Sequence, residues 1–214
     1  MEEYRKIPNL FKFDANYENI IGLNEPFDTL KDIKFMGTEK LDGTNTRIYW
    51  DGHKIQIAGR TDKSQWQGDL YKTLSEMFLT DKAEYLFEQV FGEKEAYIFG
   101  ESVGPKIQAG GELYCSKPEF YVFDVTIDGN ELNYYNVADV AKKLGLKVVT
   151  CVFFGNLKEA IDFVSTHQTS ILSLKHEMEG IVLTPEIDLY DRKGHRIKCK
   201  LKWKDLKYLN AKGV

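Results

Sequence analysis

The chain has 214 residues, of which 43% are hydrophobic and 29% are charged, and its formal net charge is −4. This composition suits one large globular domain with a real core, or one domain plus a small appendage, and excludes a polycation. No apolar run approaches the length of a membrane span, and the N-terminus lacks the apolar stretch of a signal peptide. Three cysteines without a Cys-x-x-Cys pair argue against a disulfide framework and a zinc site, so we expect a soluble cytoplasmic protein.

The expected elements alternate between hairpins and helices. Residues 51–52 and 127–131 carry Asp-Gly between alternating runs and predict two β-hairpins. Apolar spacing predicts helix within 69–91, and Asn136 and Asn156 are expected to cap two further helices. Strands are expected over 45–50, 53–59, 96–101, 120–127, 147–154, 180–184 and 195–203. The predicted fold class is therefore α+β, with antiparallel strands and helices packed outside them.

The last expected strand has an unusual basic face. Its alternation places one set of side chains inward, namely Ile197, Cys199, Leu201 and Trp203, and another set outward, namely Lys198, Lys200, Lys202 and Lys204. Residues 191–207 contain eight Lys or Arg and two Asp. Like charges in a row repel, so the face predicts a site for a polyphosphate or a nucleic-acid backbone. A solvated surface strand is the alternative interpretation.

The segment Lys40-Leu41-Asp42-Gly43 places a lysine beside a glycine turn between two expected strands. A lysine there can act as a covalent nucleophile, but only after losing its proton, which desolvation or nearby cations favour. Lys198 and Lys200 could supply those cations. The same cations would stabilise negative charge in the transition state. A nucleoside triphosphate attacked at its α-phosphate is therefore the electrophile that fits.

Two carboxylates stand where an expected strand meets a glycine: Glu101 follows Gly100, and Glu179 precedes Gly180. Such residues could hold Mg²⁺, which takes only one or two carboxylates and keeps several waters, or one of them could anchor a ribose. Arg60 could grip a phosphate, and a ring from strand 120–127 could stack on a base. Singly, each also fits a surface turn, a surface arginine or core packing, so their order along the chain carries the hypothesis.

In this order the residues resemble the motifs of the covalent nucleotidyltransferase superfamily of ATP-dependent ligases and capping enzymes, and most of all those of RNA ligases of the nick-sealing phage type. Lys40 resembles the adenylated lysine of the first motif, which Asn45 continues as Gly-Thr-Asn. The other correspondences are Glu39 and Arg60 as nucleotide contacts, Glu101 on the ribose, Phe123 (with Tyr121 as fallback) on adenine, Glu179 serving the metal, and Lys198 and Lys200 on the α-phosphate.

The resemblance covers residues 36–204 and implies one nucleotidyltransferase (adenylation) domain over residues 1–214, with no OB-fold domain in the ten residues after Lys204. It implies an ATP-dependent RNA ligase that forms lysyl-AMP on Lys40, adenylylates a 5′-phosphate end and joins it to a 3′-hydroxyl. The implied cofactors are ATP and Mg²⁺, or else Mn²⁺, with Glu101 and Glu179 as metal carboxylates. The implied partners are RNA ends in a nicked duplex or single strand, as in RNA repair, and a protein that supplies a C-terminal domain.

Three alternatives share part of this pattern. A minimal DNA ligase would use the same chemistry on another polynucleotide. A capping-type guanylyltransferase would place GMP on Lys40. A nucleic-acid-binding module without catalysis would need the basic face but no nucleophile, so the presence of Lys40, Glu101 and Glu179 speaks against it.

Overall fold

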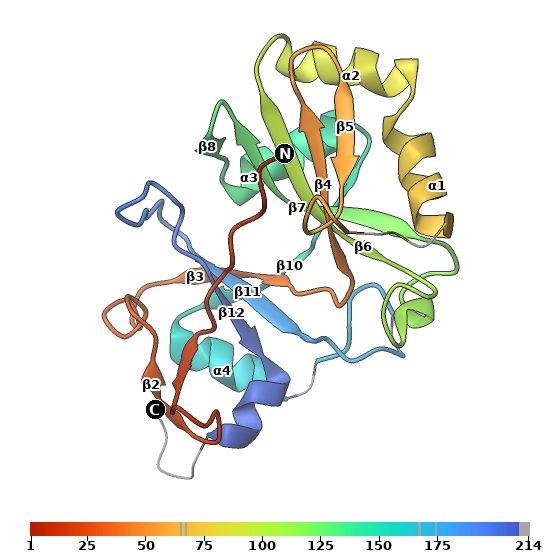
Figure 1. Ribbon diagram of the computed structural model, residues 1–214. Helices are drawn as coiled ribbons and strands as arrows, with labels where there is room; N and C mark the ends of the chain where they lie inside the picture. The colour runs from red at the N-terminus through yellow and green to blue at the C-terminus, as the bar shows by residue number, and fades with distance from the viewer. Residues whose placement is uncertain (65, 67, 167, 174, 210–214) are drawn as a thin grey trace. The chain divides into compact units, whose positions relative to one another are not determined.

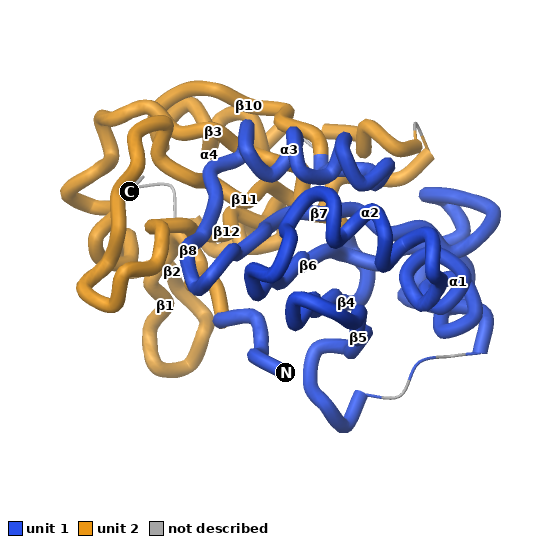
Figure 2. The backbone as a smooth tube through the Cα atoms, turned by 90° about the horizontal axis from the view of Figure 1, so that it is seen from above, with its two compact units in different colours: residues 1–5, 42–149 blue, residues 6–41, 150–214 orange. Residues whose placement is uncertain are grey.

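The computed structural model describes residues 1–64, 66, 68–166, 168–173 and 175–209. The chain forms two compact units, coloured separately in Figure 2. Unit 1 comprises residues 1–5 and 42–149, and unit 2 comprises residues 6–41 and 150–214. The chain passes from unit 2 into unit 1 after Leu41 and returns after Val149. The expected nucleophile Lys40 thus lies two residues before a change of unit.

Unit 1 is built on one sheet with the strand order β5-β4-β6-β7-β8, and β9 pairs with β7 (Figure 1). Its strands are β4 (Thr44–Trp50), β5 (Ile55–Ala58), β6 (Ala96–Val103), β7 (Glu119–Ile127), β8 (Asn130–Glu131) and β9 (Lys147–Val148). All neighbours are antiparallel except β7 and β9, which are parallel. Both predicted hairpins are confirmed, as β4–β5 and β7–β8.

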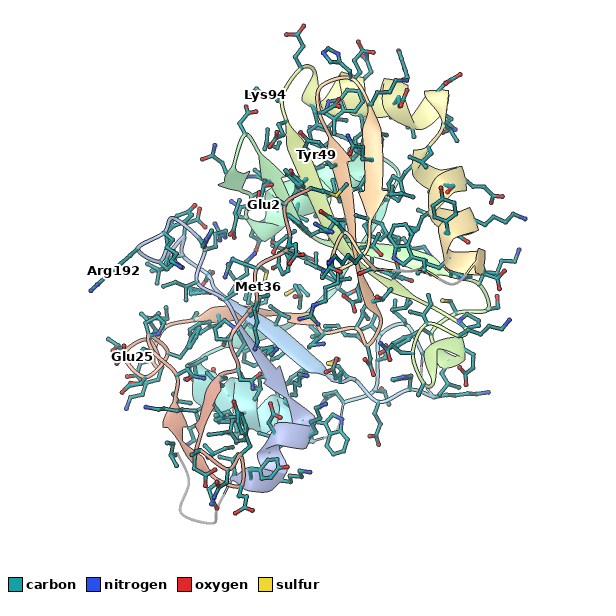
Figure 3. All side chains as sticks on the ribbon, in the orientation of Figure 1. Glu2, Glu25, Met36, Tyr49, Lys94 and Arg192 are labelled. Carbon is teal, nitrogen blue, oxygen red and sulfur yellow. The ribbon has the colours of Figure 1, made fainter. Side chains whose placement is uncertain are left out.

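Three helices cover one face of this sheet. They are α1 (Gly68–Phe78), α2 (Asp81–Phe91) and α3 (Tyr134–Lys143), and a short 3-10 helix, η1, spans Gly111–Leu113. Leu74, Phe87 and Val137 from these helices join Ile48 and Ile98 from the strands in one buried core. The opposite face carries Tyr49 (labelled in Figure 3), whose ring stacks on Tyr97 at a centroid distance of 4.6 Å. The two faces alternate along each strand, as the pleat requires.

The helices of unit 1 differ in detail from the sequence expectations. The helical pattern over 69–91 is two helices, because the Thr80 hydroxyl accepts a hydrogen bond from the amide of Ala83 and starts a new helix there. The N-cap of α3 is Asn133 and not Asn136, whose amide is instead the donor to the Asn133 side chain. Asn residues three apart are equally good caps by sequence, so local pattern alone did not separate them.

Unit 2 contains a four-stranded sheet with the order β10-β3-β11-β12 and a separate β1–β2 pair (Figure 1). Its elements are β1 (Phe11–Phe13), β2 (Ile20–Leu23), β3 (Phe35–Glu39), β10 (Cys151–Gly155), α4 (Leu157–Ser165), β11 (Gly180–Pro185), β12 (Cys199–Lys202) and the 3-10 helix η2 (Trp203–Tyr208). Asn156 caps α4 in a complete capping box, as predicted. Leu157, Ile181 and Leu201 belong to its buried core.

Two of the strands expected from the sequence differ in the structure. The strand expected over 147–154 is two short strands, β9 and β10, because the chain changes unit between Val149 and Thr150. The strand expected over 195–203 is only Cys199–Lys202. Cys199 and Leu201 are buried as expected, but Lys204 lies in η2 and is exposed. The long basic face is therefore shorter than the alternation suggested.

The α+β class with antiparallel sheets is confirmed. In the part of the chain that the structure describes, no helix combines the length and apolarity that a membrane crossing would need. All three cysteines are free thiols.

Candidate active site

Three strand ends of unit 2 bring Lys40, Glu179 and Lys202 together. Strand β11 runs antiparallel to both β3 and β12. The end of β3, the start of β11 and the end of β12 therefore lie at the same end of the sheet. The amide of Lys40 donates to the carbonyl of Gly180 at 2.9 Å, and Gly180 pairs with Lys202. Sequence positions far apart therefore converge through strand pairing alone.

The carboxylate of Glu179 bridges two lysines. Lys40 Nζ donates a hydrogen bond to its Oε2, and Lys202 Nζ lies 2.8 Å from its Oε1. Burial of the side chain, which is 14% exposed, raises the pKa of Glu179, but the two ammonium groups outweigh it and hold the pKa below the usual range. Glu179 is therefore ionised at neutral pH and keeps two like charges close to each other.

The backbone geometry at position 180 explains why a glycine follows Glu179. The backbone of Gly180 has φ of +152°, and a Cβ there would lie 2.1 Å from the carbonyl oxygen of Leu201. Only glycine permits this close approach between β11 and β12. The tight pairing sets the distance between Glu179 and Lys202.

Lys200 stands on the same face of the sheet as Lys40 and Lys202. Its partner across the pair is Val182, which in turn pairs with Thr38, two positions before Lys40. Burial, together with the charges of Lys202 and Lys40, lowers the pKa of Lys200. The region is thus a cluster of three lysines around one carboxylate, and its excess positive charge is what a polyphosphate would neutralise.

Lys198 and Glu39 are placed differently from that cluster. Lys198 precedes β12 and is buried, with 6% of its surface exposed. Glu39 pairs with Ile181, so its side chain is on the opposite face of β3 from that of Lys40. The Glu39 carboxylate accepts a hydrogen bond from the amide of Ile171 at 3.1 Å. Burial raises its pKa, against hydrogen bonds from Ser170 and Ile171.

In unit 1, three residues proposed to contact the nucleotide form a row across the face of the sheet opposite to the helices. Asn45 on β4 pairs with Glu101 on β6, and Glu101 pairs with Tyr121 on β7. Glu101 Oε1 also accepts a hydrogen bond from the amide of Gly43 at 3.2 Å. The side-chain oxygen of Asn45 is buried without a hydrogen-bond partner among the described residues. An unmet buried acceptor of this kind fits a position where a ligand hydroxyl would bind.

Phe123 does not belong to this row. Phe99 pairs with Asp124 and Gly100 with Val122, so Phe123 is the extra residue of a β-bulge. Its ring contacts Tyr4 edge-on at 5.0 Å. Tyr121, the fallback, stands directly across from Glu101, and its hydroxyl donates to Glu119 at 2.6 Å. Lys147 Nζ lies 5.4 Å from the centroid of the Tyr121 ring. The bulge, which the sequence does not reveal, decides which ring is next to Glu101.

Arg60 follows β5 and is exposed, whereas Arg47 on β4 is fully buried. The Arg47 guanidinium donates to the carbonyl oxygen of Gly59 at 2.7 Å and to Asp62 Oδ1 at 2.8 Å. It also donates to the carbonyls of Met1 and Glu2 at 3.0 and 2.7 Å. Arg47 therefore holds both sides of the turn that carries Arg60. The sequence showed no sign of this role, because the residue looks like one polar position in an alternating strand.

No group of three or more His, Cys, Asp or Glu side chains suited to a metal is found in the residues that the structure describes. Such a group is not required for Mg²⁺, which is often held by one or two carboxylates together with substrate phosphates. Glu179 and Glu101 are hard oxygen donors of the type that Mg²⁺ and Mn²⁺ accept. The donor chemistry of each thus fits a divalent cation.

The comparison with protein families is decisive for the class of protein. A family model described as RNA ligase matches residues 33–203. The chain belongs to the RNA ligase family. No curated protein matches it. As an RNA ligase family member, it carries Lys40, Glu179 and the basic end of β12 inside the matched region.

Solved structures of Naegleria gruberi RNA ligase share the fold. One mutant with ATP and Mn gives a TM-score of 0.63 at 18% identity, covering 83% of this chain and 52% of that one. A mutant with AMP and Mn gives 0.69 at 16%, covering 95% and 56%. A further mutant with ATP and Mn gives 0.66 at 17%, covering 95% and 61%. This chain therefore spans 52–61% of the length of these ligases, and at such identity the likeness shows the nucleotidyltransferase fold alone.

Proposed function

We propose that this protein is an ATP-dependent RNA ligase that works through a lysyl-AMP intermediate on Lys40. The observation that carries the proposal is the cluster at the end of the unit 2 sheet, where Glu179 bridges Lys40 and Lys202 beside Lys200. A lysine held next to other cations is suited to attack a polyphosphate and to stabilise the charge that develops. Membership of the RNA ligase family supports this assignment.

In the first step, Lys40 Nζ attacks the α-phosphorus of ATP. The new N–P bond forms as the bond from that phosphorus to the bridging oxygen breaks, and pyrophosphate leaves with the electron pair. Lys40 must first lose a proton to solvent, which neighbouring cations such as Lys200 and Lys202 favour. Lys200 and Lys202 would neutralise phosphate charge as it builds up. In the later steps AMP passes to a 5′-phosphate RNA end and is then displaced by a 3′-hydroxyl.

The other assignments concern nucleotide binding. We assign Glu101 and Asn45 to the ribose and Arg60 to a phosphate. Tyr121 is the preferred ring for adenine because it lies across from Glu101, and Phe123 is the alternative. Lys198 is assigned to the support of the α-phosphate site. Glu39, whose carboxylate lies on the opposite face from Lys40, would contact the nucleotide through its backbone.

Glu179 in unit 2 and Glu101 in unit 1 are each assigned as carboxylates that would serve Mg²⁺ or Mn²⁺, directly or through its waters, together with ATP phosphates. Such an ion would supply charge neutralisation on the phosphates and align the leaving group. The structures of the Naegleria gruberi ligase with ATP and Mn support the choice of a divalent cation.

The test is the intact mass of the protein after incubation with Mg²⁺ and either ATP or GTP. We expect a single AMP adduct in the wild type and none in Lys40→Ala, while Lys34→Ala, a matched change at an exposed lysine of unit 2, keeps it. Sealing of a nicked RNA duplex, compared with the same nick in DNA, then tests the substrate. A GMP adduct, sealing of DNA alone, or a folded wild-type protein without any adduct would each overturn the proposal.

A further inference from the structure

The N-terminal segment of unit 2 runs along the free edge of the strand that carries Lys200. The amide of Lys200 donates to the carbonyl of Pro8, and the amide of Leu10 donates to the carbonyl of Lys200, both at 2.9 Å. Asn24 fixes the segment further, since its side-chain amide donates to the carbonyls of Asn9 and Phe11. Residues from this segment therefore have a defined position beside the lysine cluster.

Beside this edge lies a hollow of about 640 Å³, within the range of roughly 300–1,000 Å³ that is common for ligand sites. Its lining includes three cations, Lys6, Lys12 and Lys200, and one acid, Asp14. Lys6 and Lys12 form no ion pair with other residues of the described ranges. Hydrogen bonds from Asn19 and from the backbone lower the pKa of Asp14 and already satisfy its charge. The hollow thus has an excess of positive charge.

The same hollow presents a stacked pair of rings. Tyr17 is 72% exposed and stands on the ring of Phe13, with centroids 5.9 Å apart and planes inclined by 28°. Phe13 is braced in turn by Tyr208, edge-on at 5.7 Å. The backbone of Tyr17 is left-handed, with φ of 58°, a conformation that bulky residues seldom adopt. A large exposed ring is thus held outward on a packed base.

We propose that this hollow binds a single-stranded stretch of the RNA substrate, with a base stacked on Tyr17 and phosphates on Lys6, Lys12 and Lys200. Aromatic rings beside a positively charged groove are the combination by which proteins hold single-stranded nucleic acid. The inference rests on the proposed RNA ligase function and adds a strand-binding site to it. Because Lys200 lines the hollow and lies on the same face of the sheet as Lys40, RNA bound here would have its phosphates on the face where the chemistry takes place.

Fluorescence anisotropy with a labelled, 5′-phosphorylated oligouridylate, in the absence of ATP, tests the proposal. Tyr17→Asn removes the ring but suits the left-handed backbone, and we expect it to weaken binding about tenfold, in line with the loss of one stacked base. Lys12→Gln should weaken binding and reduce the slope of log affinity against log salt by about 0.7, as expected for one phosphate contact on a single strand.

Two controls match these changes in residue type and exposure but lie outside the hollow. They are Tyr85→Asn, at a tyrosine that is 60% exposed on α2, and Lys158→Gln, at an exposed lysine on α4. Thermal unfolding of each variant reports folding, and Lys12→Gln serves alone if Tyr17→Asn does not fold. Wild-type affinity in both hollow variants, or equal losses in the controls, would overturn the proposal, as would binding of a protein partner without any RNA binding.

The result of this binding test can be distinguished from the result of the adduct test of the proposed function. RNA binding requires no adduct, so loss of binding in the hollow variants supports the strand site even if Lys40 takes no AMP. Conversely, an AMP adduct on Lys40 with RNA binding unaffected by Tyr17→Asn and Lys12→Gln would retain the ligase chemistry and reject the strand site.

Discussion

The ammonium of Lys40 and the carboxylate of Glu179 are hydrogen-bonded to each other across 139 positions of sequence. The same carboxylate binds Lys202, so removal of Glu179 would leave two ammonium groups together without a counter-charge. An ion pair that is neither fully buried nor fully exposed contributes an intermediate amount to the free energy of unfolding. We therefore expect Glu179→Gln to lower the free energy of unfolding by about 1–3 kcal/mol at neutral pH, between the values typical of surface and buried pairs.

Glu179 also predicts a pH dependence of stability. Its pKa is lowered in the folded protein, so its contribution is fully present above the ordinary value of 4.5 and is lost as the pH falls through the lower, folded value. Urea unfolding below about pH 5 should show a smaller loss of stability on acidification in Glu179→Gln than in the wild type. Glu186→Gln, at an exposed position of unit 2, is the control, and a slope equal to that of the wild type in Glu179→Gln would contradict the assignment.

Lys202 and Lys204 should differ sharply in their effect on adduct formation. Lys202 binds Glu179, whereas Lys204 lies in η2 and is exposed. Loss of one charge-stabilising group in a catalytic site typically costs about 10²–10³-fold in rate. Single-turnover formation of the AMP adduct should therefore be slower by about 10²-fold in Lys202→Met and change less than about twofold in Lys204→Met. Equal rates in the two variants would show that Lys202 is only structural.

The register of β6 and β7 predicts which ring binds adenine. Tyr121→Leu should raise the ATP concentration needed for half-maximal adduct formation by about tenfold, the effect of one lost stacking contact. Phe123→Leu, which loses the edge contact with Tyr4, should leave that concentration within about threefold of wild type while lowering the melting temperature. The reverse pattern would return the adenine contact to Phe123.

Arg47 and Arg60 provide a contrasting pair. Arg47→Met leaves the carboxylate of Asp62 and three carbonyl groups without their donor, and should lower the free energy of unfolding by about 3–5 kcal/mol, as for a broken buried charge network. Arg60→Met changes an exposed side chain and should alter stability by less than about 0.5 kcal/mol. Adduct formation at low ATP should nevertheless be weakened by Arg60→Met, through a higher KM, and should recover at saturating ATP. If Arg60→Met has no effect on KM, the phosphate assignment is wrong.

The local sequence pattern determined much of the fold and the place of the candidate nucleophile. Asp-Gly turns predicted both hairpins, Asn156 predicted the start of a helix, and apolar alternation predicted the buried side of β12. These predictions succeeded because each signal depends only on near neighbours along the chain. Lys40, Glu101 and Glu179 were found as polar residues at strand ends beside glycines. Lys40 and Glu179 lie directly beside a strand end, as the pattern indicated, whereas Glu101 lies inside β6, two residues before its end.

Tertiary structure alone decided the partners. The bridge from Lys40 through Glu179 to Lys202 arises from antiparallel pairing of strands that are distant in sequence, which periodicity cannot encode. The one-residue bulge at Phe123 places Tyr121 across from Glu101, because without this shift of register Val122 would pair with Glu101 and Tyr121 would lie on the other face. Hydrogen bonding of Pro8 and Leu10 to Lys200 brought the N-terminal segment to the lysine cluster. Which residues meet depends on register and sheet order, and these are fixed only when the whole chain packs.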